Sequence, residues 1–439
     1  MGLCEPYGRS CSDDGGETPV TTLREGLAAY ITVTAAYWTF MLTDGALRML
    51  VLLHFNALGF SPIHLAYLFL LYEVAGIVTN LSAGWLAARF GLTSTLYGGL
   101  GLQIIALLAL TQLDPNWTIA TSVAFVMLVQ GASGVAKDLA KMSSKSAVKH
   151  LAPAAEGALF RWVSLLTGSK NAVKGVGFLL GAVLLGALGF RSAVLAMAIL
   201  LFVILVGVIL FMPAGLPHGR RGVPFRDVFS KDPRINRLSL ARVFLFGARD
   251  VWFVVGIPIY FYAVLSDGTP EGNRTVFFLI GSFMALWVIG YGVVQATAPK
   301  LLDKYTKTES DTVSQAQFWV GTLTLIPLIL SGLALAAGGE ALWLTIMLVA
   351  GLLVFGVVFA LNSALHSYLI LAFSKSERVS MDVGFYYMAN AAGRLLGTLL
   401  SGLSFQLGGL VLCLATAAAM AGLSWFSVRH LAQVRDPLS

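Results

Sequence analysis

Charged residues are scarce in this sequence. Asp, Glu, Lys and Arg make up only 12% of its 439 residues, against about 25% in a typical soluble domain. Hydrophobic residues make up 57%, and the mean hydropathy is +0.81. The apolar runs are long and continuous, unlike the alternating segments of about ten residues in a membrane barrel. The composition therefore excludes a soluble domain and predicts an all-α integral membrane protein embedded in the lipid bilayer.

Cysteines and the common cofactor motifs are lacking as well. Cys4 and Cys11 lie in the polar stretch at the start and Cys413 in the last apolar segment, which excludes a disulfide framework. No group of Cys and His has the spacing of a metal site, and no G-x-x-x-x-G-K-S/T loop could hold a nucleotide. We therefore expect no cofactor, no metal and no nucleic-acid partner. An enzyme is disfavoured, because no set of nucleophile, base and acid is present.

Twelve apolar segments of about 20 residues or more follow one another along the chain. The polar stretch 214–237 is the one long gap, and it predicts a linker between a six-helix half at 27–213 and another at 238–439. Residues 1–26 hold five acidic residues and no apolar core, which predicts a solvated tail and not a signal peptide. The predicted spans are 27–55, 62–88, 92–113, 117–148, 157–187, 189–213, 238–265, 275–299, 316–336, 341–372, 379–407 and 409–431.

The basic residues of the loops fall on one side of the predicted membrane. The linker and the loops at Arg89, Lys300 and Lys375 are basic, whereas only Arg191 and Arg274 lie on the other side. Lys and Arg are retained in cytoplasmic loops. We therefore predict a multi-pass protein of the inner (cell) membrane with both termini in the cytoplasm, and we expect a monomer.

The two halves carry related loops after their second spans. "GWLAARFG" covers residues 84–91, and "PKLLDK" covers residues 299–304. The first resembles the G-x-L-x-D-R-x-G signature of the major facilitator superfamily, with Ala88 where the signature has Asp. That resemblance implies two pseudo-symmetric six-helix halves that alternate access to a site at the membrane midplane. The loop residues that it assigns to gating are Gly84, Arg89, Gly91, Asp303 and Lys304.

Six basic residues lie deep inside the predicted spans, where a charged side chain costs roughly 2.5–3.5 kcal/mol. If all faced lipid, the cost would be on the order of 15–20 kcal/mol, more than the net stability of most folds. They must therefore face a shared polar cavity between the halves, a partner acid, or both. The predicted ligands of an anionic substrate are Arg48, Lys137, Lys170, Lys174, Arg249 and Arg394.

A smaller set of ionisable residues accompanies these cations. Asp44 precedes Arg48 by four residues, which places both on one helical face as a candidate ion pair. Arg249 and Asp250 are adjacent, and adjacent residues do not face each other. The set could carry protons, pair with cations or hydrogen-bond across helices; its members are Asp44, Glu73, Asp138, Asp250 and His366. The cations with no acid nearby in the sequence are Lys170, Lys174 and Arg394, and they predict a substrate with at least two anionic groups.

Three blocks of the sequence resemble one branch of the superfamily, the ArsJ organoarsenical efflux permeases. They are Tyr37–Phe55, Gly131–Lys149 and Gly157–Gly181, and Met388–Gly397 fits as well. The resemblance implies export of 1-arseno-3-phosphoglycerate, the product of a functionally linked glyceraldehyde-3-phosphate dehydrogenase, and hence resistance to arsenate. The basic residues agree with it, because Arg and Lys bind phosphate-like oxyanions.

Other functions stay open at this point. A transporter that exchanges phosphate for an organic phosphate would need the same basic residues. A polytopic sensor would need a longer cytoplasmic region than the 24-residue linker. Coupling to protons through Asp44, Glu73 or Asp250 is expected, yet a uniporter would also suffice, because an inside-negative potential favours the export of anions.

Overall fold

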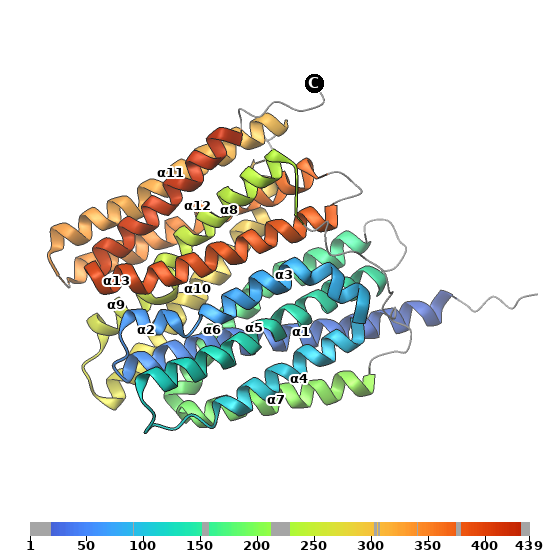
Figure 1. The fold of residues 1–439 in the computed structure, drawn as a ribbon, viewed down its shortest axis with the longest axis horizontal. Helices are drawn as coiled ribbons and strands as arrows, with labels where there is room; N and C mark the ends of the chain where they lie inside the picture. The colour runs from blue at the N-terminus through green and yellow to red at the C-terminus, as the bar shows by residue number, and fades with distance from the viewer. Residues whose placement is uncertain are drawn as a thin grey trace, which may run out of the picture.

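The computed structural model describes residues 19–431 apart from 91, 152–157, 212–228, 303–304, 306–307, 340 and 375–378. Most of the predicted tail and linker, together with Gly91, Asp303 and Lys304 of the predicted gating loops, lies outside the described residues. Every regular element among the described residues is a helix, and the long helices run roughly side by side (Figure 1). The blue-to-green first half lies below the yellow-to-red second half in that view.

The first half contains seven helices that form six spans, because a short helix and the one after it make up the second span. Ser61 caps the short helix, and its side chain accepts a hydrogen bond from the His64 backbone N–H. The helices are α1 (Pro19–Ala57), α2 (Pro62–Tyr67), α3 (Leu70–Phe90), α4 (Leu92–Leu110), α5 (Ile119–Leu151), α6 (Ala158–Leu188) and α7 (Phe190–Phe211).

The second half also forms six spans. Its first span changes from α-helix to a π-helical turn and back, and its last helix is two spans joined at Gly408 and Gly409. Gly409 has a φ of 59°, a left-handed conformation that favours glycine. The elements are α8 (Pro233–Val251), η2 (Trp252–Gly256), α9 (Ile257–Leu265), α10 (Pro270–Leu302), α11 (Glu309–Ala337), α12 (Leu342–Phe373) and α13 (Val379–Leu431).

These elements confirm the predicted all-α fold. Nine stretches within the described residues are long and apolar enough to cross a membrane, one of which is the two-span stretch Asp382–Leu431. Joining α2 to α3 and α8 to α9, and dividing α13 at its kink, gives twelve spans along the chain. The bounds of the spans agree closely with the sequence prediction, because each break falls at a Pro, a Gly or a polar cluster.

The halves pack against each other through two pairs of long helices. In the first pair α3 lies against α13, and in the second α6 lies against α10 (Figure 1). At the second contact, a Cβ added at Gly175 would lie only 2.9 Å from the backbone oxygen of Ala285. Small residues let helix backbones approach closely where lipid supplies no hydrophobic drive between helices. These two contacts bring charged side chains of both halves within reach of each other.

Candidate anion-binding site

Four of the six predicted cations lie in one connected set of buried and partly buried side chains, which we call the Glu73 network. Its contributing helices are α1, α3, α5 and α6 of the first half and α13 of the second. Its members are Asp44, Arg48, Tyr72, Glu73, Lys137, Lys174 and Arg394.

Glu73 is the centre of this network and is fully buried. One carboxylate oxygen, Oε1, lies 3.2 Å from the Nη1 atom of Arg48. The other, Oε2, accepts from the guanidinium of Arg394. Since Arg394 belongs to α13, this acid connects a cation of the first half to a cation of the second. Arg394 has no acid nearby in the sequence, as expected, but it has a partner acid on a neighbouring helix.

Asp44 lies beside the network centre, but it does not pair with Arg48 as its spacing predicted. Its Oδ1 atom accepts a hydrogen bond from the Tyr72 hydroxyl at 2.6 Å, and its Oδ2 atom lies 3.2 Å from the Lys174 ammonium. Helices α1 and α6 approach closely at Gly45, where an added Cβ would lie 2.6 Å from the Lys174 carbonyl oxygen. That approach brings Lys174 to Asp44, and Arg48 turns to Glu73 instead. Lys174, which has no acid nearby in the sequence, therefore also has a partner acid on another helix.

Lys137 is the cation of the network without an ion pair among the described residues. Its side chain is 6% exposed, and its ammonium nitrogen lies 4.0 Å from the centre of the Tyr72 ring. No group in the described part of the chain accepts a hydrogen bond from that nitrogen. A cation on an aromatic face keeps its hydrogen-bond donors free for another ligand. Lys137 is therefore the best-placed donor for a bound anion.

The charges of the Glu73 network do not balance. Four cations, Arg48, Lys137, Lys174 and Arg394, surround two acids, Asp44 and Glu73, so two formal positive charges are left over. Buried charge without compensation is costly, and a bound anion removes that cost. The network therefore has the charge to receive a dianionic group.

A second acid site borders the network. Asp138 does not bind its neighbour Lys137; it lies 3.2 Å from the Lys141 ammonium and accepts a hydrogen bond from the Thr79 hydroxyl at 2.5 Å. The Lys141 ammonium also donates to Asn80 Oδ1 at 2.6 Å. A Cβ added at Gly76 would lie 3.6 Å from Arg394 Nη2 and 3.7 Å from Asp138 Oδ2, so this site adjoins the network.

The other predicted ligands lie differently. Arg249 forms a separate ion pair with Asp250, at 2.6 Å between Nη2 and Oδ1. This corrects the expectation that adjacent residues do not pair: the long guanidinium arm folds back over the Phe246 ring, 4.8 Å from its centre. Lys170 lies one helical turn before Lys174 and is half-buried, and its role stays a prediction.

Sequence reasoning missed Arg242 as a site residue. This side chain is only 4% exposed, and its guanidinium donates to the Ser363 carbonyl oxygen at 3.2 Å and hydroxyl at 3.0 Å. It lies near the start of its predicted span, where a cation is ordinarily an interfacial anchor. Its position seven residues before Arg249, about two helical turns, was the signal that it faces the interior. The predicted residue His366 is fully buried one turn beyond Ser363.

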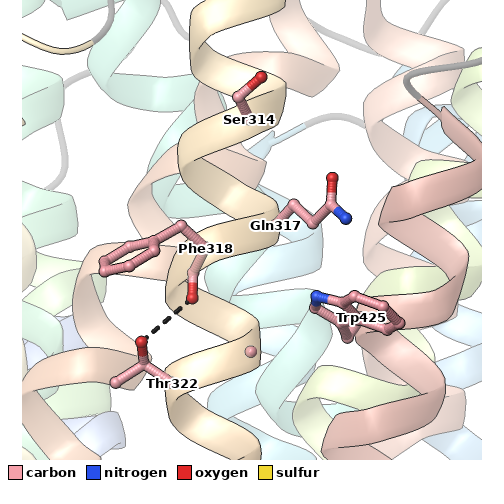
Figure 2. Close-up of a pocket in the computed structure, with 6 residues that line it drawn as sticks. Ser314, Gln317, Phe318, Thr322 and Trp425 are labelled. Atoms are coloured by element: carbon pink, nitrogen blue, oxygen red, sulfur yellow. Dashed lines mark hydrogen bonds between the residues drawn. The ribbon is translucent and has the colours of Figure 1, made fainter.

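Figure 2 shows a pocket elsewhere on the molecule, between α11 and the end of α13. It is lined by uncharged residues, and no member of the Glu73 network is among them. The residues are Ser314, Gln317, Phe318, Gly321, Thr322 and Trp425. It therefore offers an anion no charge.

Residues 29–398 match the family model described as Major Facilitator Superfamily. This match spans most of the chain and both halves of the fold. The chain belongs to the major facilitator superfamily. A protein of this superfamily with several membrane-spanning helices is a multi-pass membrane transporter.

Two solved structures resemble the fold of this chain. A POT family transporter in complex with 5-aminolevulinic acid has a TM-score of 0.68 and 14% identity, covering 92% of this chain and 96% of its own. A POT family transporter in complex with a thioalcohol-conjugated peptide gives the same TM-score and identity, covering 92% of this chain and 98% of its own. No curated protein matches the sequence. At this identity the likeness shows the major facilitator fold alone.

The gating loops of the major facilitator signature stay a prediction for this chain. Gly84 and Arg89 belong to the end of α3, and Gly91 follows it outside the described residues. Asp303 and Lys304 of the second loop also lie outside them.

Proposed function

We propose that this major facilitator protein exports an organic oxyanion, 1-arseno-3-phosphoglycerate, and thereby confers resistance to arsenate. The observation that supports the proposal is the surplus of two positive charges in the Glu73 network, at whose edge the Lys137 ammonium has no ion pair among the described residues. The substrate carries a phosphate at one end and an arsenate at the other, and both are ligands for Arg and Lys.

Cations from both halves in one network suit a transport site. Arg48, Lys137 and Lys174 belong to the first half and Arg394 to the second. When an anion binds between them, it interacts with both halves at once, and it competes with Glu73 for Arg394 and Arg48. A ligand can shift an alternating-access equilibrium only through such differential contacts. We propose that substrate binding loosens the Glu73–Arg394 contact and lets the halves move.

The proposal includes an orientation and a metabolic setting. Both termini and the linker between 27–213 and 238–439 would face the cytoplasm of the inner membrane, where a glyceraldehyde-3-phosphate dehydrogenase would supply the substrate. Export would be favoured by the inside-negative potential, at about 2.3 kcal/mol per charge per 100 mV. Proton antiport through Asp44, Glu73 or Asp250 would add to that drive.

The test is arsenate tolerance in cells that lack their own arsenate efflux and their own glyceraldehyde-3-phosphate dehydrogenase. We expect tolerance only when this protein and the dehydrogenase are expressed together, because neither makes and exports the ester alone. Lys231→Ala serves as the control, since Lys231 is an exposed residue outside the spans. Tolerance without the dehydrogenase, or none with it, would contradict the proposal. Exchange of phosphate for a phosphorylated metabolite in vesicles, with no effect on arsenate tolerance, would instead support the organic-phosphate antiporter.

A further inference from the structure

The second half buries a separate group of polar side chains between α8, α12 and α13, which we call the Arg242 cluster. It consists of Arg242, Asn362, Ser363, His366 and Tyr386, all buried. Arg242 binds the carbonyl and hydroxyl of Ser363, whose hydroxyl also accepts a hydrogen bond from Gln295 at 3.3 Å. These contacts fix the guanidinium in place among three helices and α10.

Several polar atoms of the cluster have no hydrogen-bond partner among the described residues. Both side-chain polar atoms of Asn362 and both ring nitrogens of His366 lack a hydrogen-bond partner in the described part of the chain. The Nε atom of Arg242 lacks one too. Buried polar groups are nearly always hydrogen-bonded, so a group of such atoms in one place indicates a position for water or for a ligand. Asn362 and His366 lie one helical turn apart on α12, so their side chains share a face.

The chemistry of the cluster favours an anion over water. Arg242 has no carboxylate within ion-pair distance among the described residues; its guanidinium lies 4.1 Å from the centre of the Phe246 ring and 4.9 Å from that of Tyr386. Water would satisfy the hydrogen bonds of Asn362 and His366, but it would leave the buried charge of Arg242 without a counterion. An oxyanion supplies that counterion and accepts hydrogen bonds from the guanidinium of Arg242, the amide nitrogen of Asn362 and one imidazole N–H of His366.

The cluster lies close to the Glu73 network. The backbone of Val243, the residue after Arg242, packs directly against Gly393, the residue before Arg394. The Tyr386 ring contacts the Tyr387 ring at 5.9 Å between centres, and the Lys141 ammonium of the first half lies 5.5 Å from the Tyr387 ring. The cluster thus reaches the boundary between the halves on the side of the network that holds Asp138 and Lys141.

We propose that Arg242, Asn362 and His366 form a second oxyanion subsite, which receives the far anionic group of a substrate whose near group binds the Glu73 network. This inference rests on the proposed export of an organic oxyanion and names the feature that such a substrate must have: two anionic groups on one short carbon chain. A molecule with a single anionic group fills the first site only.

Two stable probes distinguish a protein with one anion subsite from a protein with two. Propane-1,3-diyl bisphosphate carries a phosphate at each end of three carbons, and propyl phosphate carries one. Binding of each is measured by calorimetry on the purified full-length protein in lipid nanodiscs. The wild type binds the bisphosphate at least about tenfold more tightly, since each buried charged contact contributes that much or more. Arg242→Gln removes this preference and leaves the dissociation constant of propyl phosphate within about twofold.

A control variant and a second test variant guard against a folding artefact. Arg234→Gln changes a cation at the start of the same helix that pairs with Asp232, and it keeps the preference. Asn362→Ala removes an unsatisfied amide without touching charge, and it lowers the preference by about threefold or more. Each variant is checked by size exclusion in the same lipid.

Other results overturn the inference. Equal affinity of the wild type for the two probes excludes the second subsite and leaves oxyanion export standing. Equal weakening of both probes by Arg242→Gln and Asn362→Ala means that the cluster only supports the fold. Failure of the wild type to bind either phosphate overturns the inference together with the proposed function.

Discussion

Two cations of the first half and one buried cation of the second half are compensated in different ways. In the first half, Arg48 and Lys174 each face an acid on another helix of that half. In the second half, Arg242 faces the oxygens of Ser363 and no acid among the described residues. The paired cations are held in place by acids that the protein supplies. The unpaired ones, Lys137 and Arg242, mark where a ligand can supply the missing charge.

The contrast predicts that acids of the first half are structural as well as functional. Glu73→Gln leaves Arg48 and Arg394 buried without the carboxylate that joins them. Removing one partner of a buried ion pair costs about 3–5 kcal/mol. We expect a large fall in the midpoint of thermal unfolding in detergent and loss of export. Glu271→Gln changes an exposed glutamate at the start of α10, and it should alter neither the unfolding midpoint nor export. Unchanged unfolding of Glu73→Gln would show that the network does not hold the halves together.

Replacing Lys137 should affect anion binding but should not lower stability, in contrast to replacing Glu73. Lys137→Met keeps an unbranched side chain, one atom shorter, and removes a buried charge that has no acid partner among the described residues. Stability should hold or rise, because a buried cation is replaced by an apolar group. Affinity for the anion should fall by about tenfold to a thousandfold, for a loss of about 2–5 kcal/mol. Thermal unfolding measures the stability of the variant, and calorimetric titration with propyl phosphate measures its affinity for the anion. If Lys137→Met were destabilised and still bound propyl phosphate, Lys137 would stabilise the fold and would not be a ligand of the anion.

The smallest effect is expected at the border of the network. Thr79→Ala removes one hydroxyl donor from Asp138, which keeps its contacts with Asn80 and Lys141. A hydrogen bond to a charged group contributes about 1.5 kcal/mol or somewhat more. Export should slow several-fold without loss of folding. Ser82→Ala on the same helix is the matched control, since its hydroxyl donates only within α3 among the described residues.

Much of the fold could be predicted from the sequence, because bilayer thickness fixes span length and Gly, Pro and charge fix the breaks. The division of the second span into α2 and α3 could not be predicted, since its apolar character is continuous. The sequence also placed Arg48, Lys137, Lys174 and Arg394 inside the predicted spans, and the structure joins them in one network.

Partnership between side chains could not be predicted in the same way. Spacing reports neighbours on one helix, whereas Lys174 binds Asp44 and Arg394 binds Glu73 across helices. Those partners depend on helix approach at positions such as Gly45, which sequence spacing does not locate. Arg242 was overlooked because its place near a span end resembled that of an interfacial anchor.

The most direct test of the Glu73 network as a transport site is substrate accumulation in everted membrane vesicles. Labelled 1-arseno-3-phosphoglycerate is formed outside the vesicles from labelled glyceraldehyde-3-phosphate, arsenate, the oxidised nicotinamide cofactor and the dehydrogenase. Vesicles with the wild type should accumulate label only when arsenate is present, and vesicles with equal amounts of folded Lys137→Met should not. Equal accumulation by the two proteins, or accumulation by neither, would contradict the account.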